Sequence, residues 1–567
     1  MTKRLRLQLL RSGLKAFNFG LAHRMSSQQV HRGYKEAVLA LNSLQTNANV
    51  LAAIQAAGPQ PASKVLGQTT HYLRRLGYKP DDLNALGVVH ISGTKGKGST
   101  AAFCSTLLTT INPEAKVGLF TSPHLVAVRE RIRINGKPIT EELFAKYFWE
   151  VWDRFEDGHG EPALPDLSIR PAYFRYLTCM AYHVFLSERV DATILEVGVG
   201  GLLDPTNIVP SPIVTGVTSL GLDHVNVLGY SILEIAGHKG GIFKPGVPAL
   251  TIEQASSGAV EVLRARAVEL KASSFSIVPR HPELDQANLG LAGEHQKINA
   301  SLALALINTF LASPRLPDHF KLQKSSLPDA TAAITPSPFL PPPPTNPAPI
   351  IPDISSLPLP PILPSEFLTP HPISDLFRQA LQATKWPGRC QIVQDPYKPR
   401  ISWSLDGAHT VESIACCGKW WRELIRSSDQ TGKRALIFNC TSGRSGKTLL
   451  KMLKESLDEG SNEKFEFDLV IISTNTTFSS GKSTGDLTCI VTQLGTKSEL
   501  TVQNEIAEAW KSITSLDTNV IVTRSIEDAV GEIHKIDDQP LNVLVTGSLH
   551  LVGGVLEVAQ LLDSSFA

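Results

Sequence analysis

Short apolar runs that alternate with helical patterns constrain the fold of this chain more than any other feature. Each run is bounded by glycine or polar loops. The runs occupy residues 88–91, 117–120, 192–195 and 213–217 in a first region and 401–405, 435–438, 469–472, 520–522 and 543–545 in a second. Such runs are typical of strands in a parallel sheet, because helices cover both faces of that sheet. The sequence therefore predicts an α/β protein with two mostly parallel sheets, and a Rossmann-like second domain.

The chain length and one change in composition set the predicted domain boundaries. The 567 residues are too many for one hydrophobic core. Residues 313–372 hold 18 of the 38 prolines, and such a segment can propagate neither a helix nor a central strand. We expect an extended, mostly disordered insertion there, between a domain at 31–312 and another at 373–567. A proline-rich ligand for a partner domain is the alternative interpretation.

The N-terminal segment differs from the rest of the chain. Eight basic residues precede the first acidic residue, Glu36, and leucines are interleaved with them. A basic, acid-free segment that can form an amphipathic helix is typical of a mitochondrial transit peptide, which we place at residues 1–30. A second start at Met25 would leave a cytoplasmic form. The alternative is a disordered basic tail.

Overall composition excludes several classes of protein. The formal net charge is +1, which gives no reason to expect a nucleic-acid-binding surface. No apolar run approaches the roughly 20 residues that cross a bilayer, so we expect no integral membrane association. The seven cysteines show no metal-like spacing and suit a reducing compartment.

The most specific local signal is a glycine-rich loop between an apolar run and a helical stretch. It reads Gly-Thr-Lys-Gly-Lys-Gly-Ser over residues 93–99. Its glycines allow the backbone to approach phosphate oxygens, and the following helix N-terminus favours an anion. Lys97 can reach phosphates and Ser99 can face a metal ion. The loop departs from the usual P-loop because Gly98 separates Lys97 from Ser99. A surface turn is the alternative interpretation.

This loop resembles the nucleotide loop of the folylpolyglutamate and dihydrofolate synthase family, relatives of the Mur peptide ligases. Six further segments match in order, and the resemblance covers roughly residues 30–312 and 373–563. They are residues 120–132, 195–207, 218–224, 238–246, 291–299, and 386–389 with 406–410. The fold that this implies is a P-loop-type ATPase domain followed by a Rossmann-like ligase domain. The ATP-binding residues that it implies are Thr94, Lys95, Gly96, Lys97, Gly98, Ser99, Asn299, Arg389, Asp406 and His409.

The resemblance also implies a metal centre and a folate-binding loop. Two Mg²⁺ ions are expected, and a monovalent cation such as K⁺ is a further expectation from the resemblance. The implied metal ligands are Ser99, Ser122, Glu196, His224 and Lys239, and the folate-binding residues are Ser122, Pro123 and His124. Glu196 ends an apolar run, where a buried carboxylate needs a cation nearby. By resemblance Lys239 is carbamylated; the alternative is a lysine that faces phosphate. Lys97, Lys239 and His224 are the candidate catalytic residues.

The activity implied by the resemblance is ATP-dependent addition of L-glutamate to the γ-carboxylate of folates through an acyl phosphate. A monomer acting on folate, L-glutamate and ATP is expected. Lys-Gly-Gly-Ile-Phe-Lys at 239–244 is more similar to eukaryotic folylpolyglutamate synthases than to the dihydrofolate enzymes. Residues 442–445 and 202–203 depart from the family pattern and leave the pocket details open. The alternatives are a dihydrofolate synthase, a nucleotide-dependent switch and a scaffold.

Overall fold

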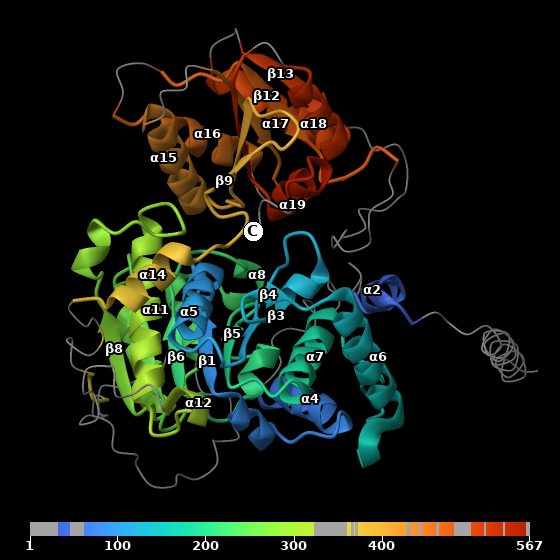
Figure 1. The fold of residues 1–567 in the computed structure, drawn as a ribbon, viewed down its shortest axis with the longest axis vertical. Coiled ribbons are helices and arrows are strands. Elements are labelled where there is room, and N and C mark those ends of the chain that lie inside the picture. The colour runs from blue at the N-terminus through green and yellow to red at the C-terminus, as the bar shows by residue number, and fades with distance from the viewer. Residues whose placement is uncertain are drawn as a thin grey trace, which may run out of the picture.

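The protein folds into two lobes, each built on a largely parallel sheet, as the sequence predicted (Figure 1). The structure is a computed structural model that describes residues 32–45, 62–321, 360–363, 368, 372–427, 432–440, 445–460, 464–480, 500–514, 518–536 and 539–562. The predicted transit segment 1–30, with Met25, lies outside the described residues, as do residues 442–444 of the departing loop. None of the described helices is long and apolar enough to span a bilayer.

The first lobe contains an eight-stranded sheet in the order β4-β3-β2-β5-β1-β6-β7-β8. Its strands are β1 (Val88–Ser92), β2 (Val117–Phe120), β3 (Ile132–Ile134), β4 (Lys137–Pro138), β5 (Ala192–Glu196), β6 (Val214–Val217), β7 (Pro248–Ile252) and β8 (Ser274–Val278). All pairs are parallel except those that β3 makes. The four strands predicted in this region are confirmed. The prediction missed the short strands β3 and β4, and also β7 and β8. Strand β7 begins with a proline and β8 contains two serines in place of a continuous apolar run.

Helices cover both faces of this sheet, because the apolar side chains of each strand alternate between two clusters. In β1, Val89 and Ile91 pack with helices α5 (Lys97–Ile111), α11 (His295–Ala312) and α14 (Asp375–Ala383). Val88 packs on the opposite face with α2 (Tyr34–Asn42), α4 (Ala62–Arg75), α6 (Glu141–Asp157) and α7 (Tyr173–Ser187). Helices α9 (Ile232–Gly240) and α10 (Ala259–Glu269) form a further cluster. The strand ends are therefore the accessible parts of the sheet.

Parts of the predicted proline-rich insertion are ordered, which differs from our expectation. Residues 318–321 form α12 (Asp318–Lys321), where Phe320 is buried in the first-lobe core. Pro361 accepts a 2.9 Å hydrogen bond at its carbonyl from the N–H of Phe275, and Leu363 is buried. Pro361 and Leu363 contact the edge strand β8, whereas Phe320 packs on Phe310 of α11. The proline content of the segment concealed these contacts. Residues 322–359 of the insertion lie outside the described residues.

The second lobe contains a six-stranded sheet in the order β13-β12-β11-β14-β10-β9. Its strands are β9 (Gln391–Gln394), β10 (Ile401–Leu405), β11 (Lys433–Phe438), β12 (Leu469–Ser473), β13 (Asn519–Thr523) and β14 (Leu541–Thr546). Helices α15 (Val411–Ser427), α16 (Gly446–Asp458) and α17 (Thr501–Ile513) cover one face. Helices α18 (Ile526–His534) and α19 (Leu549–Val558) cover the other. The five predicted strands are confirmed, whereas the antiparallel edge strand β9 was missed because polar residues begin and end it.

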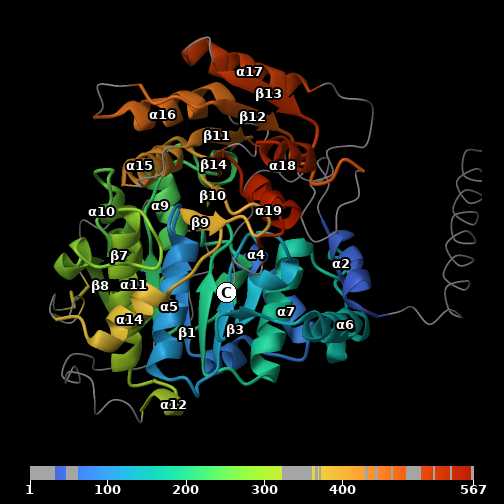
Figure 2. The ribbon, with the colours of Figure 1, turned by 45° about the horizontal axis from the view of Figure 1, so that its top comes forward.

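The two lobes meet through a loop of the first lobe that packs into the second. Leu125 and Val126, which follow β2, are buried in the same cluster as residues of β10, β14 and α19. Figure 2 shows α19 and β9 on the side of the second lobe that faces the first. The carboxyl ends of the first-lobe strands thus lie near the junction of the two lobes.

Candidate active site

The candidate site begins where three neighbouring strands of the first lobe end. Strands β5, β1 and β6 are adjacent and parallel. The glycine-rich loop follows β1, Glu196 is the last residue of β5, and His224 lies beyond the end of β6. Because parallel strands end at one edge, the topology brings these three predicted segments together. Ligand sites of open α/β sheets lie at this edge.

The glycine-rich loop is held in a conformation that presents the start of α5. Gly93 and Gly96 have φ values of 144° and 88°, in the left-handed region that favours glycine. The N–H groups of Thr94 and Lys95 donate to the carbonyl of Ser219, at 2.9 and 3.0 Å. No side chain caps the N-terminus of α5. Its first N–H groups, together with the helix dipole, are suited to binding an anion.

Helix α11 packs against this loop through Asn299. A Cβ at Gly96 would lie 2.2 Å from Oδ1 of Asn299. Asn299 donates from Nδ2 to Gln296, whose own Nε2 donates to Oγ of Ser99 at 3.3 Å. The predicted residues Asn299 and Ser99 are therefore joined by one hydrogen-bonded chain. Gln296 is the link; it lies in the matching segment 291–299, but no role had been assigned to it.

Lys97 acts electrostatically on two buried groups of opposite charge type. Its Nζ lies 3.5 Å from the carbonyl oxygen of Thr94. Burial raises the pKa of Glu196 above its ordinary value, and the positive charge of Lys97 is the largest effect that opposes this rise. The same charge adds to burial in lowering the pKa of Lys239. Lys97 therefore lies close enough to influence both a carboxylate and an amine.

Glu196 and Ser122 are brought together by the ends of β5 and β2. The backbone N–H of Ser122 donates to Oε2 of Glu196 at 3.0 Å, and Glu196 is only 4% exposed. Within the described part of the chain, no three His, Cys, Asp or Glu side chains gather as a metal cluster. The predicted metal ligands thus depend on hydroxyl oxygens and on Lys239 in addition to Glu196 and His224.

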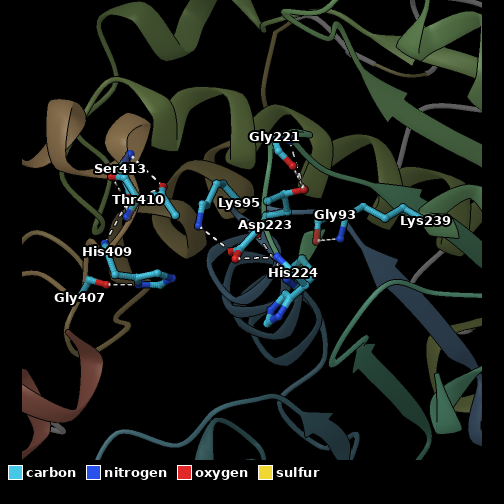
Figure 3. A network of polar contacts seen from close by, with 12 residues as sticks. Gly93, Lys95, Gly221, Asp223, His224, Lys239, Gly407, His409, Thr410 and Ser413 are labelled. Carbon is cyan, nitrogen blue, oxygen red and sulfur yellow. Dashed lines mark hydrogen bonds and ion pairs between the residues drawn. The ribbon is translucent and has the colours of Figure 1, made fainter. Parts of the chain in front are cut away.

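Asp223 forms the centre of a polar network after β6 (Figure 3). It forms a 3.2 Å ion pair with Nζ of Lys95 and accepts a 3.0 Å hydrogen bond from the backbone N–H of His224. Burial alone would raise the pKa of Asp223, but the charges of Lys95, His224 and His409 hold it well below its usual range. Lys95 is therefore held by a carboxylate to which the sequence had assigned no role.

Lys239 projects from α9 onto the glycine-rich loop (Figure 3). Its Nζ donates a 2.8 Å hydrogen bond to the carbonyl of Gly93, and the side chain is buried. Burial is the main reason that the pKa of Lys239 lies well below its ordinary value. Burial therefore makes the neutral amine of Lys239 more accessible than that of an exposed lysine.

The predicted residues of the second lobe lie on the loop that follows β10 and on the connection before β9. Asp406 uses both carboxylate oxygens to hold backbone N–H groups, those of Cys390 at 2.8 Å and Ala408 at 2.9 Å. His409 pairs through Nδ1 with the carbonyl of Gly407 at 2.7 Å (Figure 3). Arg389 donates to the carbonyl of Gly388 at 3.2 Å. Asp406 thus fixes the backbone next to Arg389 and His409, because Cys390 and Ala408 are their chain neighbours.

A pocket between the lobes is lined by the predicted folate loop. The lining residues come from both lobes and from their connection: Gly98, Thr121, Ser122, Pro123, His124, Leu125, Glu130, Arg133, Glu196, Trp386, Pro387, Arg389 and Leu549. His124 accepts a 2.9 Å hydrogen bond at Nδ1 from Nε of Arg131. Glu130 accepts the N–H groups of Leu125, Val126 and Ala127 at 3.1, 2.9 and 2.7 Å. The segment that follows the predicted folate-binding residues is therefore fixed by one buried carboxylate.

Two comparisons of the sequence decide the family. The C-terminal domain family of dihydrofolate synthetase matches residues 389–558. Folylpolyglutamate synthase of Saccharomyces cerevisiae, from strains S288c and YJM789, is 39% identical over 540 residues, which cover 94% of this chain and 88% of that protein. The chain belongs to the folylpolyglutamate synthase family.

Solved structures agree with this family on the level of the fold. Mycobacterium tuberculosis folylpolyglutamate synthase complexed with ADP aligns with a TM-score of 0.59 at 21% identity, over 93% of this chain and 99% of that one. The bifunctional folylpolyglutamate synthase/dihydrofolate synthase of Yersinia pestis, complexed with AMPPNP and Mn ion, aligns at 0.57 and 21%, over 91% and 99%. The two-lobed architecture is thus that of the folylpolyglutamate synthases.

Several residues of this member of the folylpolyglutamate synthase family were missed as site residues. Asp223 was overlooked because a single acid after a strand is common in surface loops. Glu130 lies in the matching segment 120–132, and its position before Arg131 was a usable signal. Trp386 was quoted within a matching segment, but only the structure places its ring beside Gly98.

Proposed function

We propose that this protein is an ATP-dependent ligase that adds L-glutamate to the γ-carboxylate of folates. The observation that carries the proposal is the arrangement around Lys97, at the uncapped N-terminus of α5. The charge of Lys97 affects the pKa values of buried Glu196 and buried Lys239. Glu196 also lines the interlobe pocket, together with Arg389 of the interlobe connection. Membership in the folylpolyglutamate synthase family supports the same conclusion.

The chemistry follows from the poor reactivity of a carboxylate as an acyl donor. The γ-carboxylate oxygen of the folate's terminal glutamate attacks the γ-phosphorus of ATP, which releases ADP and leaves an acyl phosphate. The α-amine of the incoming glutamate then attacks the acyl carbon, and inorganic phosphate leaves as the amine loses a proton. Both reactants of the first step are anionic, so positive groups must bring them together. A pocket between two lobes can exclude water from the acyl phosphate.

We assign the ATP phosphates to the N-terminus of α5, with Thr94, Lys95, Gly96, Lys97, Gly98 and Ser99. Lys97 is the residue that would face the transferring phosphoryl group. Asn299 lies against Gly96 from α11, Arg389 lies in the interlobe connection, and His409 lies in the second lobe. Asp406 would act by holding the backbone of that loop in addition to any contact with nucleotide.

We propose that two Mg²⁺ ions bind near Lys97. Ser99, Ser122 and Glu196 would offer oxygen atoms to one ion, and His224 with Lys239 would help to hold the second. The fit rests on Glu196: it is buried and lines the pocket, and hard oxygen donors are what Mg²⁺ prefers. A bound Mg²⁺ neutralises charge on phosphate oxygens. Ser122, Pro123 and His124 would contact the folate.

We also propose that Lys239 is carbamylated in the active protein. A cationic lysine would repel a metal ion, whereas a carbamate supplies an anionic oxygen. Carbamylation needs a neutral amine and carbon dioxide, and burial favours the neutral amine of Lys239. In the structure its Nζ is held by the carbonyl of Gly93, beside the phosphate loop.

Product analysis with two acceptors tests the proposed function. Purified protein is incubated with ATP, Mg²⁺, L-glutamate and either tetrahydrofolate monoglutamate or dihydropteroate, and products are identified by mass spectrometry. We expect the folate acceptor to gain glutamyl residues with glutamate-dependent release of ADP. Conversion of dihydropteroate alone would assign a dihydrofolate synthase. ADP release at the same rate with and without L-glutamate would indicate a nucleotide-dependent switch. Absence of any turnover would favour a scaffold.

We propose that the protein works in mitochondria and in the cytoplasm, as a monomer. The support for mitochondrial targeting is the basic, acid-free composition of residues 1–30, and that for a cytoplasmic form is Met25. Light scattering during size-exclusion chromatography tests the monomer, since a dimer would elute with twice the mass of one chain.

A further inference from the structure

The connection between the lobes touches the phosphate loop through one side chain. Helix α14 belongs to the first lobe and β9 to the second, so residues 384–390 connect them. The indole of Trp386, in this connection, packs against the first-lobe core and lines the interlobe pocket. A Cβ placed on Gly98 would lie 3.2 Å from Nε1 of Trp386. This ring is therefore in contact with the start of α5.

The indole is held in place from another side by Arg133. The guanidinium carbon of Arg133 lies 4.7 Å from the centre of a Trp386 ring. Arg133 is itself fixed, because its Nε donates to the carbonyl of Glu130 at 3.1 Å and it is only 6% exposed. With a buried cation over the ring and an apolar core beneath it, the ring has little freedom to retreat from Gly98.

Gly98 is not required by the backbone. It lies in the first turn of α5, and its φ is not in the left-handed region, so alanine could adopt its conformation. The atoms nearest to a Cβ there belong to Trp386 and, at 3.7 Å, to Glu196. Contact with Trp386 therefore favours glycine between Lys97 and Ser99, at the position that departs from the usual P-loop.

We propose that Trp386 is a positioning residue that fixes the phosphate loop relative to the interlobe connection. Held between Arg133 and Gly98, it aligns the N-terminus of α5 with Arg389, three residues further along. The nucleotide-binding groups of the first lobe and of the connection are thereby set at one fixed separation. This inference rests on the proposed nucleotide site, but its test does not require ligase turnover.

A double-mutant cycle tests the contact directly. We would measure the affinity for ADP with Mg²⁺ by titration calorimetry, and KM for ATP, in Gly98→Ala, Trp386→Phe and the double variant. Gly98→Ala should weaken ADP binding by about tenfold, since a displacement of a few tenths of an ångström at a binding site is costly. In the double variant the smaller ring leaves room for the methyl group. The combined loss should therefore be smaller than the product of the single losses.

A matched control separates this effect from a general cost of alanine in a helix. Gly67 lies in α4, and nothing packs within 4 Å of the place that a methyl group would take, so Gly67→Ala should leave ADP affinity unchanged. Thermal unfolding should show that Gly98→Ala and Gly67→Ala are both folded at the temperature of the titration. Equal ADP affinity in Gly98→Ala and Gly67→Ala would overturn the inference, as would losses that multiply in the double variant. If ADP binding follows the cycle while no folate product forms, the proposed function fails and the positioning role stands.

Discussion

Lys239 donates a 2.8 Å hydrogen bond from Nζ to the carbonyl oxygen of Gly93, so helix α9 contacts the phosphate loop through one buried amine. The contact places a group with a lowered pKa beside the proposed metal and nucleotide site. A neutral lysine can hold this hydrogen bond, and so can the N–H of a carbamate. Both forms of the side chain can therefore keep this hydrogen bond.

Substitution of Lys239 should separate these two forms. Lys239→Ala should lose activity by about a hundredfold or more, and short carboxylic acids such as acetate should restore part of it by occupying the vacated position. Lys239→Arg should stay inactive, because guanidinium keeps its positive charge. Steady-state assays with and without acetate provide the measurement. Full activity in Lys239→Arg would contradict the carbamate.

Lys97→Ala should abolish most of the activity without affecting the fold. The side chain is only half-buried, and its hydrogen bond to the carbonyl of Thr94 is long, at 3.5 Å. Its removal should cost little stability, whereas loss of a charge at the transferring phosphoryl should lower kcat by a factor of about 10² to 10³. Lys64→Ala, at an exposed position of α4, serves as the control. Comparable turnover in the two variants would argue against the assigned role.

Much of the fold and the main site segments could be predicted from the sequence, whereas side-chain partners could not. Apolar runs indicated nine strands, and a strand–loop–helix pattern predicted the position of the glycine-rich loop between β1 and α5. Strand β9 escaped because an edge strand needs no continuous apolar run. The ion pair of Lys95 with Asp223 joins residues 128 positions apart, and it depends on β1 and β6 being neighbours. Sheet order is set by tertiary packing, so a local pattern does not reveal it.

Glu130 should control the shape of the folate loop. Its carboxylate accepts three backbone N–H groups, from Leu125, Val126 and Ala127. In Glu130→Gln, an amide NH₂ would face at least one of these donors, which should cost about 1–3 kcal/mol of unfolding free energy. KM for folate should rise more than KM for ATP. Urea unfolding and steady-state kinetics measure both effects, with exposed Glu253→Gln as the control. An unchanged ratio of the two KM values would refute this role.

The N-terminal segment should direct the protein to two compartments. Residues 1–35 fused to a fluorescent reporter should enter mitochondria, because their basic residues have no acidic neighbours before Glu36. Initiation at Met25 should leave the reporter in the cytoplasm. Fluorescence microscopy with a mitochondrial marker, alongside a fusion in which the basic residues up to Arg24 are replaced by serine, provides the comparison. Cytoplasmic location of the complete fusion would exclude the transit function.

Lys244 should make the stability of the first lobe depend on pH above neutrality. Burial lowers the pKa of Lys244 to about 8, and its Nζ donates to the carbonyl of Asn207 at 2.8 Å. In the unfolded chain the lysine has a pKa of about 10.4. Between these values the unfolded chain binds more protons than the folded one, so this lysine makes the unfolding free energy rise with pH, by at most about 3 kcal/mol. Lys244→Met removes that contribution. Urea unfolding between pH 7 and 10 measures this. The unfolding free energy of the variant minus that of the parent protein should be largest at pH 7 and should fall as the pH rises. If the unfolding free energies of Lys244→Met and the parent protein differ by the same amount at every pH in this range, Lys244 keeps its ordinary pKa.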